Sequence, residues 1–160
     1  MSWNDYRYEE STAPERKPGV YRCVISDAEI TTAKSSGARM LKLSLRPSGS
    51  KSVVYGYIID NDHFNQNFSE FLDAFPELGK ETSPDNCYSF VGAEGAVKLT
   101  VDDNGFFRTA QYPWIAARKA ETMTLPPYVW VPRDGEAMER PVYEGFSQIA
   151  ADEDDDLPFM

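Results

Sequence analysis

The chain has 160 residues, of which 41% are hydrophobic and 26% charged, and its formal net charge is −10 at pH 7. This length suits one compact domain with flexible ends and leaves too little chain for a second core. No apolar run approaches the roughly 20 residues that span a bilayer, and the start MSWNDYRYEE lacks the apolar stretch of a signal peptide, so we expect no membrane partner and a cytoplasmic location.

The first part of the chain changes character at residue 19. Residues 1–18 show no hydrophobic periodicity and contain Pro14 and Pro18, which predicts a flexible N-terminal arm. β-Branched and aromatic residues then dominate GVYRCVISDAEI (19–30) and predict a first strand, followed by a polar turn.

The segment MLKLSLR (40–46) alternates in polarity with the period of a strand. Its leucines lie on one face, and Lys42, Ser44 and Arg46 lie on the other. We therefore expect a half-buried second strand with a basic outward face. A third strand, SVVYGYII (52–59), follows the next turn, and its Gly56 predicts a bulge or a sharp bend.

A helix and a hairpin are predicted next. In DNDHFNQNFSEFLDAF (60–75) the apolar residues recur at helical spacing, with Asp62 as the expected N-cap. Alternating residues in AVKLTVDDNGFFRTAQY (96–112) flank the turn sequence Asp103-Asn104-Gly105 and predict a hairpin. Periodicity then fades, so we expect an extended linker over 116–151, docked around Tyr128-Val129-Trp130, and a disordered acidic tail.

The predicted order is strand, strand, strand, helix, strand, strand. This is the order of the OB-fold, a five-stranded Greek-key barrel whose strand 2–3 face and adjoining loops bind oligonucleotides. We therefore predict an all-β domain with one helix over 19–115, an OB-fold-like barrel with its helix between strands 3 and 4. SH3-like and other small β-barrels give nearly the same pattern and stay open as alternatives.

The distribution of charge matters more than its sum. An acidic chain should avoid nucleic acid, because affinity for a polyanion comes largely from Lys and Arg. However, residues 152–156 carry half of the net charge, whereas residues 30–59 contain no acid. The basic residues of that segment are Lys34, Arg39, Lys42, Arg46 and Lys51.

A protein that binds single-stranded DNA needs a positive groove and exposed aromatic rings on which bases stack. The five basic residues supply the charge, and Tyr55 and Tyr57 share one face of the third strand. In FFRTAQYPW (106–114) we expect Arg108 and Tyr112 to contribute to DNA binding. They are an even number of residues apart and so lie on one face of the predicted strand, and Trp114 is expected on the same face. The alternative is a solvated basic edge beside half-buried core tyrosines.

Enzymatic and metal chemistry have little support in the sequence. The acid pairs Asp60/Asp62 and Asp102/Asp103 could hold a metal for nuclease chemistry, but a helix start and a hairpin turn already explain them. Cys23 and Cys87 are the only cysteines, and with the single His63 they do not form a zinc ligand set. We expect structural, reduced cysteines, no cofactor, no metal and no catalysis.

The chain closes with DEDDDLPFM (152–160). A run of acids is typical of a solvated extension, but the apolar tip suits capture in a partner's pocket, with the acids steering it to a basic rim. DDDLPF resembles the acidic tip of bacterial single-stranded DNA-binding proteins, which recruits replication, recombination and repair enzymes. The resemblance implies partner binding by Asp154, Asp155, Asp156, Leu157, Pro158 and Phe159. Met160 departs from that pattern, in which phenylalanine is the last residue.

The body of the chain carries a second resemblance. PGVYRCVISDAEITTAKSSGARMLKLSL, the helix and KLTVDDNGFFRTAQY together are similar to a family of small phage proteins assigned as single-strand binders. This resemblance implies sequence-tolerant binding of single-stranded DNA in phage or prophage replication or recombination. An acidic protein–protein adaptor or DNA mimic that binds no nucleic acid stays the alternative. The sequence leaves the oligomeric state open, homo-oligomers included.

Overall fold

The computed structural model describes residues 16–144, so the acidic tip and nearly all of the predicted N-terminal arm lie outside the described residues. The described elements follow the predicted order of three strands, a helix and two strands, with a short second helix at the end. Their bounds are β1 Gly19–Thr32, β2 Arg39–Pro47, β3 Val54–Ile59, α1 Phe64–Ala74, β4 Glu94–Val101, β5 Phe107–Ile115 and α2 Ala117–Glu121.

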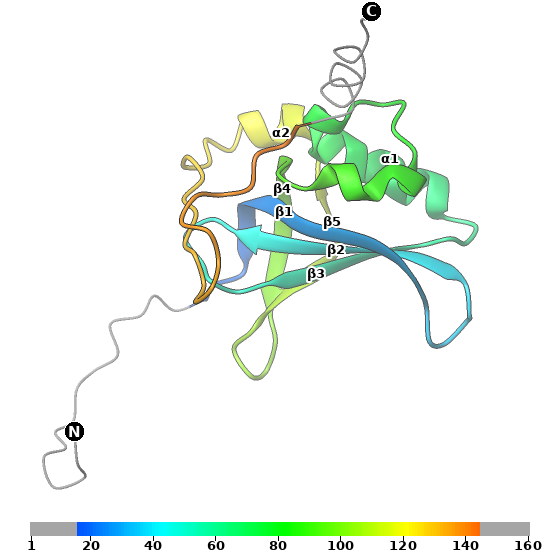
Figure 1. The fold of residues 1–160 in the computed structure, drawn as a ribbon, viewed down its shortest axis with the longest axis horizontal. Helices are drawn as coiled ribbons and strands as arrows, with labels where there is room; N and C mark the ends of the chain where they lie inside the picture. The colour runs from blue at the N-terminus through cyan, green and yellow to red at the C-terminus, as the bar shows by residue number, and fades with distance from the viewer. Residues whose placement is uncertain (1–15, 145–160) are drawn as a thin grey trace, which may run out of the picture.

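The five strands form one sheet in the order β3-β2-β1-β4-β5, and all neighbouring pairs are antiparallel. The long β1 pairs with β4 through its first half and with β2 through most of its length, with a register shift between Ile25 and Asp27. The two edges of the sheet then approach each other, because the Thr109 hydroxyl of β5 donates to the Tyr55 carbonyl of β3 at 3.4 Å. The sheet nearly closes into a barrel, and the predicted OB-like fold is confirmed (Figure 1).

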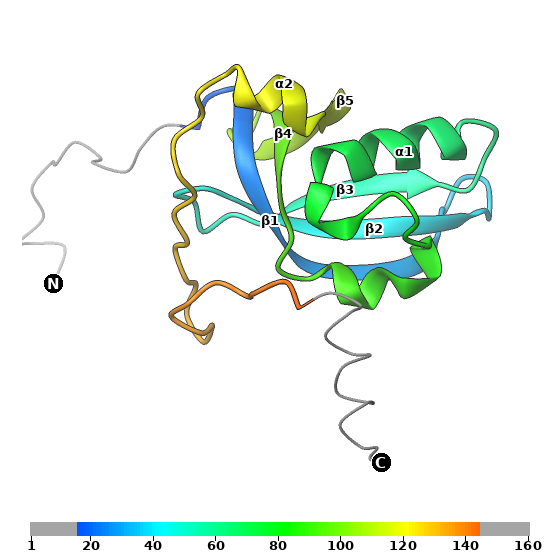
Figure 2. The ribbon, with the colours of Figure 1, turned by 90° about the horizontal axis from the view of Figure 1, so that it is seen from above.

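The core lies between the curved sheet and α1. The leucines of β2 point inward and are buried, as their alternation predicts. Phe71 of α1 is fully buried, and its ring centroid lies 5.0, 5.8 and 5.1 Å from those of Phe75, Phe90 and Trp114. Figure 2 shows α1 lying over the strands, and its buried Phe68, Phe71 and Leu72 belong to the same core cluster as the β2 leucines.

The predicted N-cap is wrong, and of the bulge or sharp bend predicted at Gly56 the bulge is absent. The N-cap of α1 is His63 and not Asp62, and its side chain makes no capping hydrogen bond; the Asn61 side-chain oxygen instead accepts from the His63 backbone N–H at 2.9 Å. Gly56 marks no bulge, since β2 and β3 pair without a register shift. A Cβ at Gly56 would lie 3.0 Å from the Trp114 ring, so close packing is the reason for glycine there.

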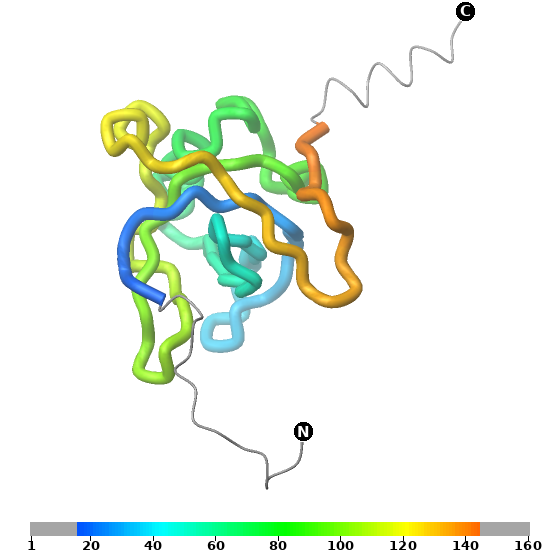
Figure 3. Tube along the Cα trace, turned by 90° about the vertical axis from the view of Figure 1, so that its left-hand side faces the viewer, coloured from blue at the N-terminus to red at the C-terminus, as the bar shows by residue number. Residues whose placement is uncertain are grey.

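The chain after α2 crosses the outside of the barrel. We call residues 125–143 the strap (Figure 3, yellow to orange). It is held by backbone and side-chain contacts: Gly49 donates its N–H to the Val129 carbonyl at 2.7 Å, and the Tyr128 hydroxyl donates to the Arg46 carbonyl at 2.9 Å. Within residues 16–144 no helix has the length and apolar character needed to cross a membrane.

Candidate nucleic-acid interface

The outer face of β2 and β3 brings two predicted tyrosines and one lysine together. The strand register places Lys42 opposite Tyr57 and Ser44 opposite Tyr55. Tyr55 is 43% exposed and Tyr57 49% exposed. The Lys42 ammonium lies 4.5 Å from the centroid of the Tyr55 ring, a distance typical of a cation–π contact. This part of the predicted site is therefore assembled on one surface.

A bulge in β5 adds Tyr112 to this surface. Val97 of β4 pairs with Trp114, whereas Leu99 pairs with Thr109, so β5 accommodates extra residues between the two pairs. Such bulges re-aim side chains. Tyr112 is 72% exposed, and Trp114 turns into the core, where it packs edge-on against Phe71. The prediction that Trp114 faces the same side of the strand as Tyr112 is wrong for this reason.

The β3 and β5 edges and α1 enclose a groove of about 280 Å³, which we call the seam groove. The exposed Tyr57 and Tyr112 line it together with the half-buried Trp114. Asn67 and Glu70 line it from α1. Sequence reasoning missed this groove, because it depends on the closure of the barrel and on the β5 bulge.

Two hairpin loops project from one side of the barrel. Figures 1 and 3 show the β1–β2 loop and the β4–β5 loop both extending below the sheet. The first carries the exposed Lys34. Phe106, 56% exposed, follows the second, and the Arg16 guanidinium lies 5.4 Å from the centroid of its ring. Loops of this kind adjoin the ligand face of an OB-fold.

Several basic residues predicted to meet DNA already face carboxylates. Arg39 forms an ion pair with Asp60 at 3.2 Å, and Arg108 forms one with Asp102 at 3.0 Å. In the β1–β2 register Lys42 lies opposite Glu29, an acid immediately outside the acid-free segment. The exposed Lys34 and Lys51 lie in turns. The sheet therefore intersperses acids among the basic residues that the sequence groups together.

Arg46 was expected at the surface, and this expectation is wrong. Its side chain is 0% exposed, because the strap covers this end of β2. One guanidinium nitrogen lies 2.7 Å from each carboxylate oxygen of Glu136, another donates to the Val131 carbonyl, and the guanidinium carbon lies 4.2 Å from the Trp130 ring centroid. Alternation placed Arg46 on the outward face, but it did not reveal the segment packed over it.

Two of the four acids considered for a metal site, Asp60 and Asp102, are engaged in other contacts. Asp102 accepts hydrogen bonds from the backbone N–H groups of Phe106 and Asn104, both at 2.9 Å, and from Arg108. The hydrogen bond from Phe106 is the largest cause that holds the pKa of Asp102 below its ordinary value. The bonds from Arg108 and Asn104 lower this pKa further. Within residues 16–144 no group of three or more His, Cys, Asp and Glu side chains could hold a metal ion. Cys23 and Cys87 are free and buried, and burial raises the pKa of both thiols.

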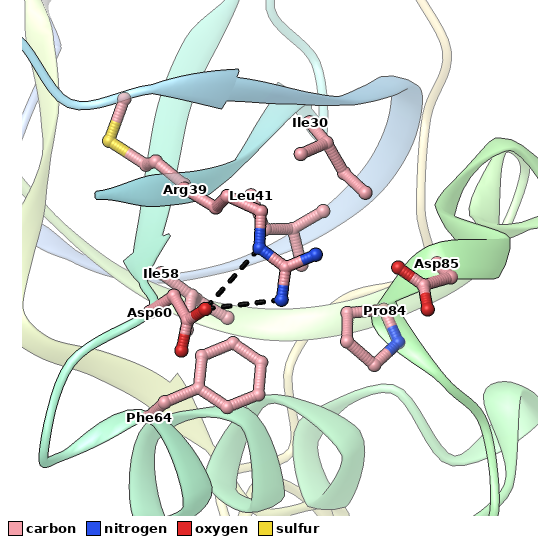
Figure 4. Close-up of a pocket in the computed structure, with 9 residues that line it drawn as sticks. Ile30, Arg39, Leu41, Ile58, Asp60, Phe64, Pro84 and Asp85 are labelled. Atoms are coloured by element: carbon pink, nitrogen blue, oxygen red, sulfur yellow. Dashed lines mark hydrogen bonds and ion pairs between the residues drawn. The ribbon is translucent and has the colours of Figure 1, made fainter. Parts of the chain in front are cut away.

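A second hollow lies beside the start of α1 (Figure 4). Its volume is about 70 Å³, and apolar side chains such as Ile30 and Ile58 form most of its wall, with the Arg39–Asp60 pair beside it. It is much smaller than the seam groove, and the exposed tyrosines do not line it. The seam groove is therefore the better candidate for a flat aromatic ligand.

Comparison with protein-family models and with curated protein sequences finds no match for this chain. Its function is therefore inferred from its own residues and their arrangement.

Proposed function

We propose that this chain is a non-enzymatic, sequence-tolerant single-stranded DNA-binding protein of a phage or prophage, acting in replication or recombination. The observation that carries the proposal is the row of exposed rings on an OB-like barrel, Tyr55, Tyr57 and Tyr112. Bases stack on such rings whatever their sequence, and each stacked base contributes about 1–3 kcal/mol. The strand would run over the outer face of β2, β3 and β5, between the two hairpin loops.

Phosphate contacts in this proposal come mainly from lysines. Lys34 and Lys51 are exposed, and Lys42 lies over Tyr55 in the middle of the face. Arg39 and Arg108 contribute only if a phosphate replaces their present carboxylate partners. With so few available cations and a net charge of −10, stacking supplies a larger share of the affinity than charge does.

The proposal is tested by titrating the full chain with oligo-dT while following tyrosine and tryptophan fluorescence. We expect quenching, weak competition by duplex DNA, and a log-affinity that falls with log salt at about −0.7 per phosphate neutralised. An absence of binding at low salt contradicts the proposal.

The acidic tip has a separate role in the proposal. Asp154, Asp155 and Asp156 would steer the tip to a basic rim on a replication or recombination enzyme, and Leu157, Pro158 and Phe159 would fill its pocket. Support for this role comes from the sequence alone. Deleting residues 152–160 should leave the affinity for single-stranded DNA equal or higher, because the acids compete for the same cations. A large loss of affinity would show that the tip belongs to the DNA site.

A protein–protein adaptor is the second candidate, and the ion pairs favour it. Arg39 and Arg108 each form an ion pair with a carboxylate of the same chain, and the strap covers Arg46, so the open face carries less positive potential. In an adaptor the exposed tyrosines would pack against side chains of a protein partner instead of nucleobases. Charge reversal at Lys42 and Lys34 would then leave partner binding unchanged, and the oligo-dT titration would show no quenching.

A further inference from the structure

We propose that the seam groove holds one nucleobase of the bound strand and prefers a base with an exocyclic amino group. The inference rests on the proposed function, since it assigns a subsite within the same face. It adds a base preference to binding that stacking alone would leave tolerant of sequence.

The groove has a rigid aromatic wall. Trp114 makes edge-to-face contacts with Phe71 and Phe75, and its ring centroid lies 5.1 Å from that of Phe71 and 6.1 Å from that of Phe75. The far end of its six-membered ring packs on the buried side of Gly56, where even a Cβ would lie only 3.0 Å from the ring. Tyr57 and Tyr112, the exposed rings of the groove, lie on β3 and β5. A base that stacks on Trp114 meets a ring that packing already holds in place, which favours binding because this ring does not have to be ordered first.

The charge of the groove selects a base over a phosphate. None of the described residues that line the groove is basic, and Glu70 is the one charged side chain among them. A phosphate would be repelled by this carboxylate, whereas a neutral base would not. The strand would therefore keep its backbone near the lysines of the outer face and turn a base into the groove.

Glu70 also determines which base fits best. An ionised carboxylate only accepts hydrogen bonds, so it pairs with the amino group of cytosine, adenine or guanine. Uracil and thymine present a carbonyl oxygen at the corresponding position of the ring, and two acceptors facing each other repel. The hydrogen bond that Glu70 receives from Gln66 is long, at 3.4 Å, and leaves the carboxylate with acceptor capacity for a ligand.

Two amides add to the recognition of the base edge. Asn67 lines the groove from α1, and Gln111 lines it from β5. A carboxamide offers both a donor and an acceptor, so each can pair with ring nitrogens and carbonyl oxygens that Glu70 cannot satisfy. The groove thus combines stacking surface with polar groups that distinguish one base from another.

The test compares oligo-dC with oligo-dU of equal length at neutral pH, because the two bases are similar in size and differ at the amino or carbonyl group. We expect the wild-type chain to bind oligo-dC about fivefold more tightly. Glu70→Gln should bring the two affinities within about twofold, because an amide both donates and accepts. Asp73→Asn is the matched control, since it removes one negative charge from an exposed position of α1 outside the groove and should keep the preference.

The outcomes separate this inference from the proposed function. Equal binding of oligo-dC and oligo-dU by the wild-type chain overturns the base preference and leaves DNA binding standing. A preference that survives in Glu70→Gln, or is lost equally in Asp73→Asn, shows that the Glu70 carboxylate does not select the base. An absence of binding to both oligonucleotides overturns the inference together with the proposed function.

Discussion

The outward face of β2 has two ends that differ in their contact with water. Lys42 and Arg46 lie on this same face, four residues apart, by the alternation of the strand. Lys42 is partly exposed and lies over Tyr55, whereas Arg46 is 0% exposed beneath the strap. Periodicity decides which side of a sheet a residue faces, and a segment 80–90 residues later in the chain decides whether that side is open. We infer that the covered end is structural and the open end is functional.

Removing Arg46 should have the largest effect. Arg46→Ala removes a fully buried side chain, leaves a cavity beneath the Trp130 ring and takes away the hydrogen bonds to Val131 and Glu136; the Glu136 side chain is 32% exposed, so water can solvate its carboxylate. From the lost packing and hydrogen bonds we expect urea denaturation to show a free energy of unfolding lower by about 3 kcal/mol. Lys42→Ala, on the open end, is the control and should change it by less than about 0.5 kcal/mol. Equal losses would show that the two ends do not differ.

Gly92→Ala tests the other end of the strap. Gly92 has a φ of +95°, and a Cβ there would lie 2.2 Å from the Tyr143 backbone nitrogen, so the strap would have to move. We expect a loss of about 2 kcal/mol in the free energy of unfolding, from strain and displaced contacts together.

Gly37→Ala is the matched control for this substitution. It has a φ of +75° with no atom within 4 Å of the added Cβ, so it isolates the backbone strain. We expect it to lose about 1 kcal/mol. If Gly92→Ala costs no more than Gly37→Ala, the strap is not packed on Gly92.

Lys42→Gln should weaken DNA binding without unfolding the protein. Removing one phosphate contact should lower the affinity for oligo-dT about threefold at low salt and reduce the slope of log-affinity against log salt by about 0.7. Arg39→Gln is the comparison, because Arg39 is already paired with Asp60 and should contribute less. A larger effect at Arg39 than at Lys42 would place the strand nearer to the Asp60 side of the sheet.

The smallest expected effect is a pH dependence of the stabilisation that the Glu136 contact with the strap and Arg46 gives to the fold. The backbone N–H of Arg133 and the Arg46 guanidinium hold the pKa of Glu136 below its ordinary value of 4.5. A lowered folded-state pKa means that the ionised carboxylate stabilises the fold fully above pH 4.5 and loses this stabilisation as the pH falls below it. The free energy of unfolding of wild type should therefore approach that of Glu136→Gln in acid. A difference that stays constant with pH contradicts this contact.

Local patterns in the sequence were sufficient for most of the fold. The leucines of β2 and the phenylalanines of α1 repeat at the periods of a strand and a helix, and these periods reflect burial on one face. The turn at Asp103-Asn104-Gly105 was also predictable, because this residue run is typical of hairpin turns. Gly105 takes the positive φ, +85°, that glycine favours in such a turn. The barrel follows from the order of these elements.

The candidate site was less predictable because long-range contacts complete it. The bulge that turns Tyr112 outward and Trp114 inward depends on how β5 pairs with β4. The burial of Arg46 depends on Glu136, 90 residues away. The five-residue helix α2 is too short to show a period of its own. The sequence predicted Tyr55 and Tyr57 on one face of the third strand and Tyr112 in a separate cluster, but it did not predict the groove that Tyr57 and Tyr112 share with Trp114.

The affinity of a Tyr57→Ala/Tyr112→Ala double variant for oligo-dT tests the central claim most directly. Tyr88→Ala is the matched control, since Tyr88 is 64% exposed and lies in the 3₁₀ segment Pro84–Phe90, outside the proposed face. We predict that the double variant binds at least about 30-fold more weakly, from about 1 kcal/mol or more for each lost stacking ring, and that Tyr88→Ala binds as the wild type does. A double variant that binds like the wild type, or a Tyr88→Ala variant that loses as much, contradicts the assignment of the open aromatic face as the DNA site.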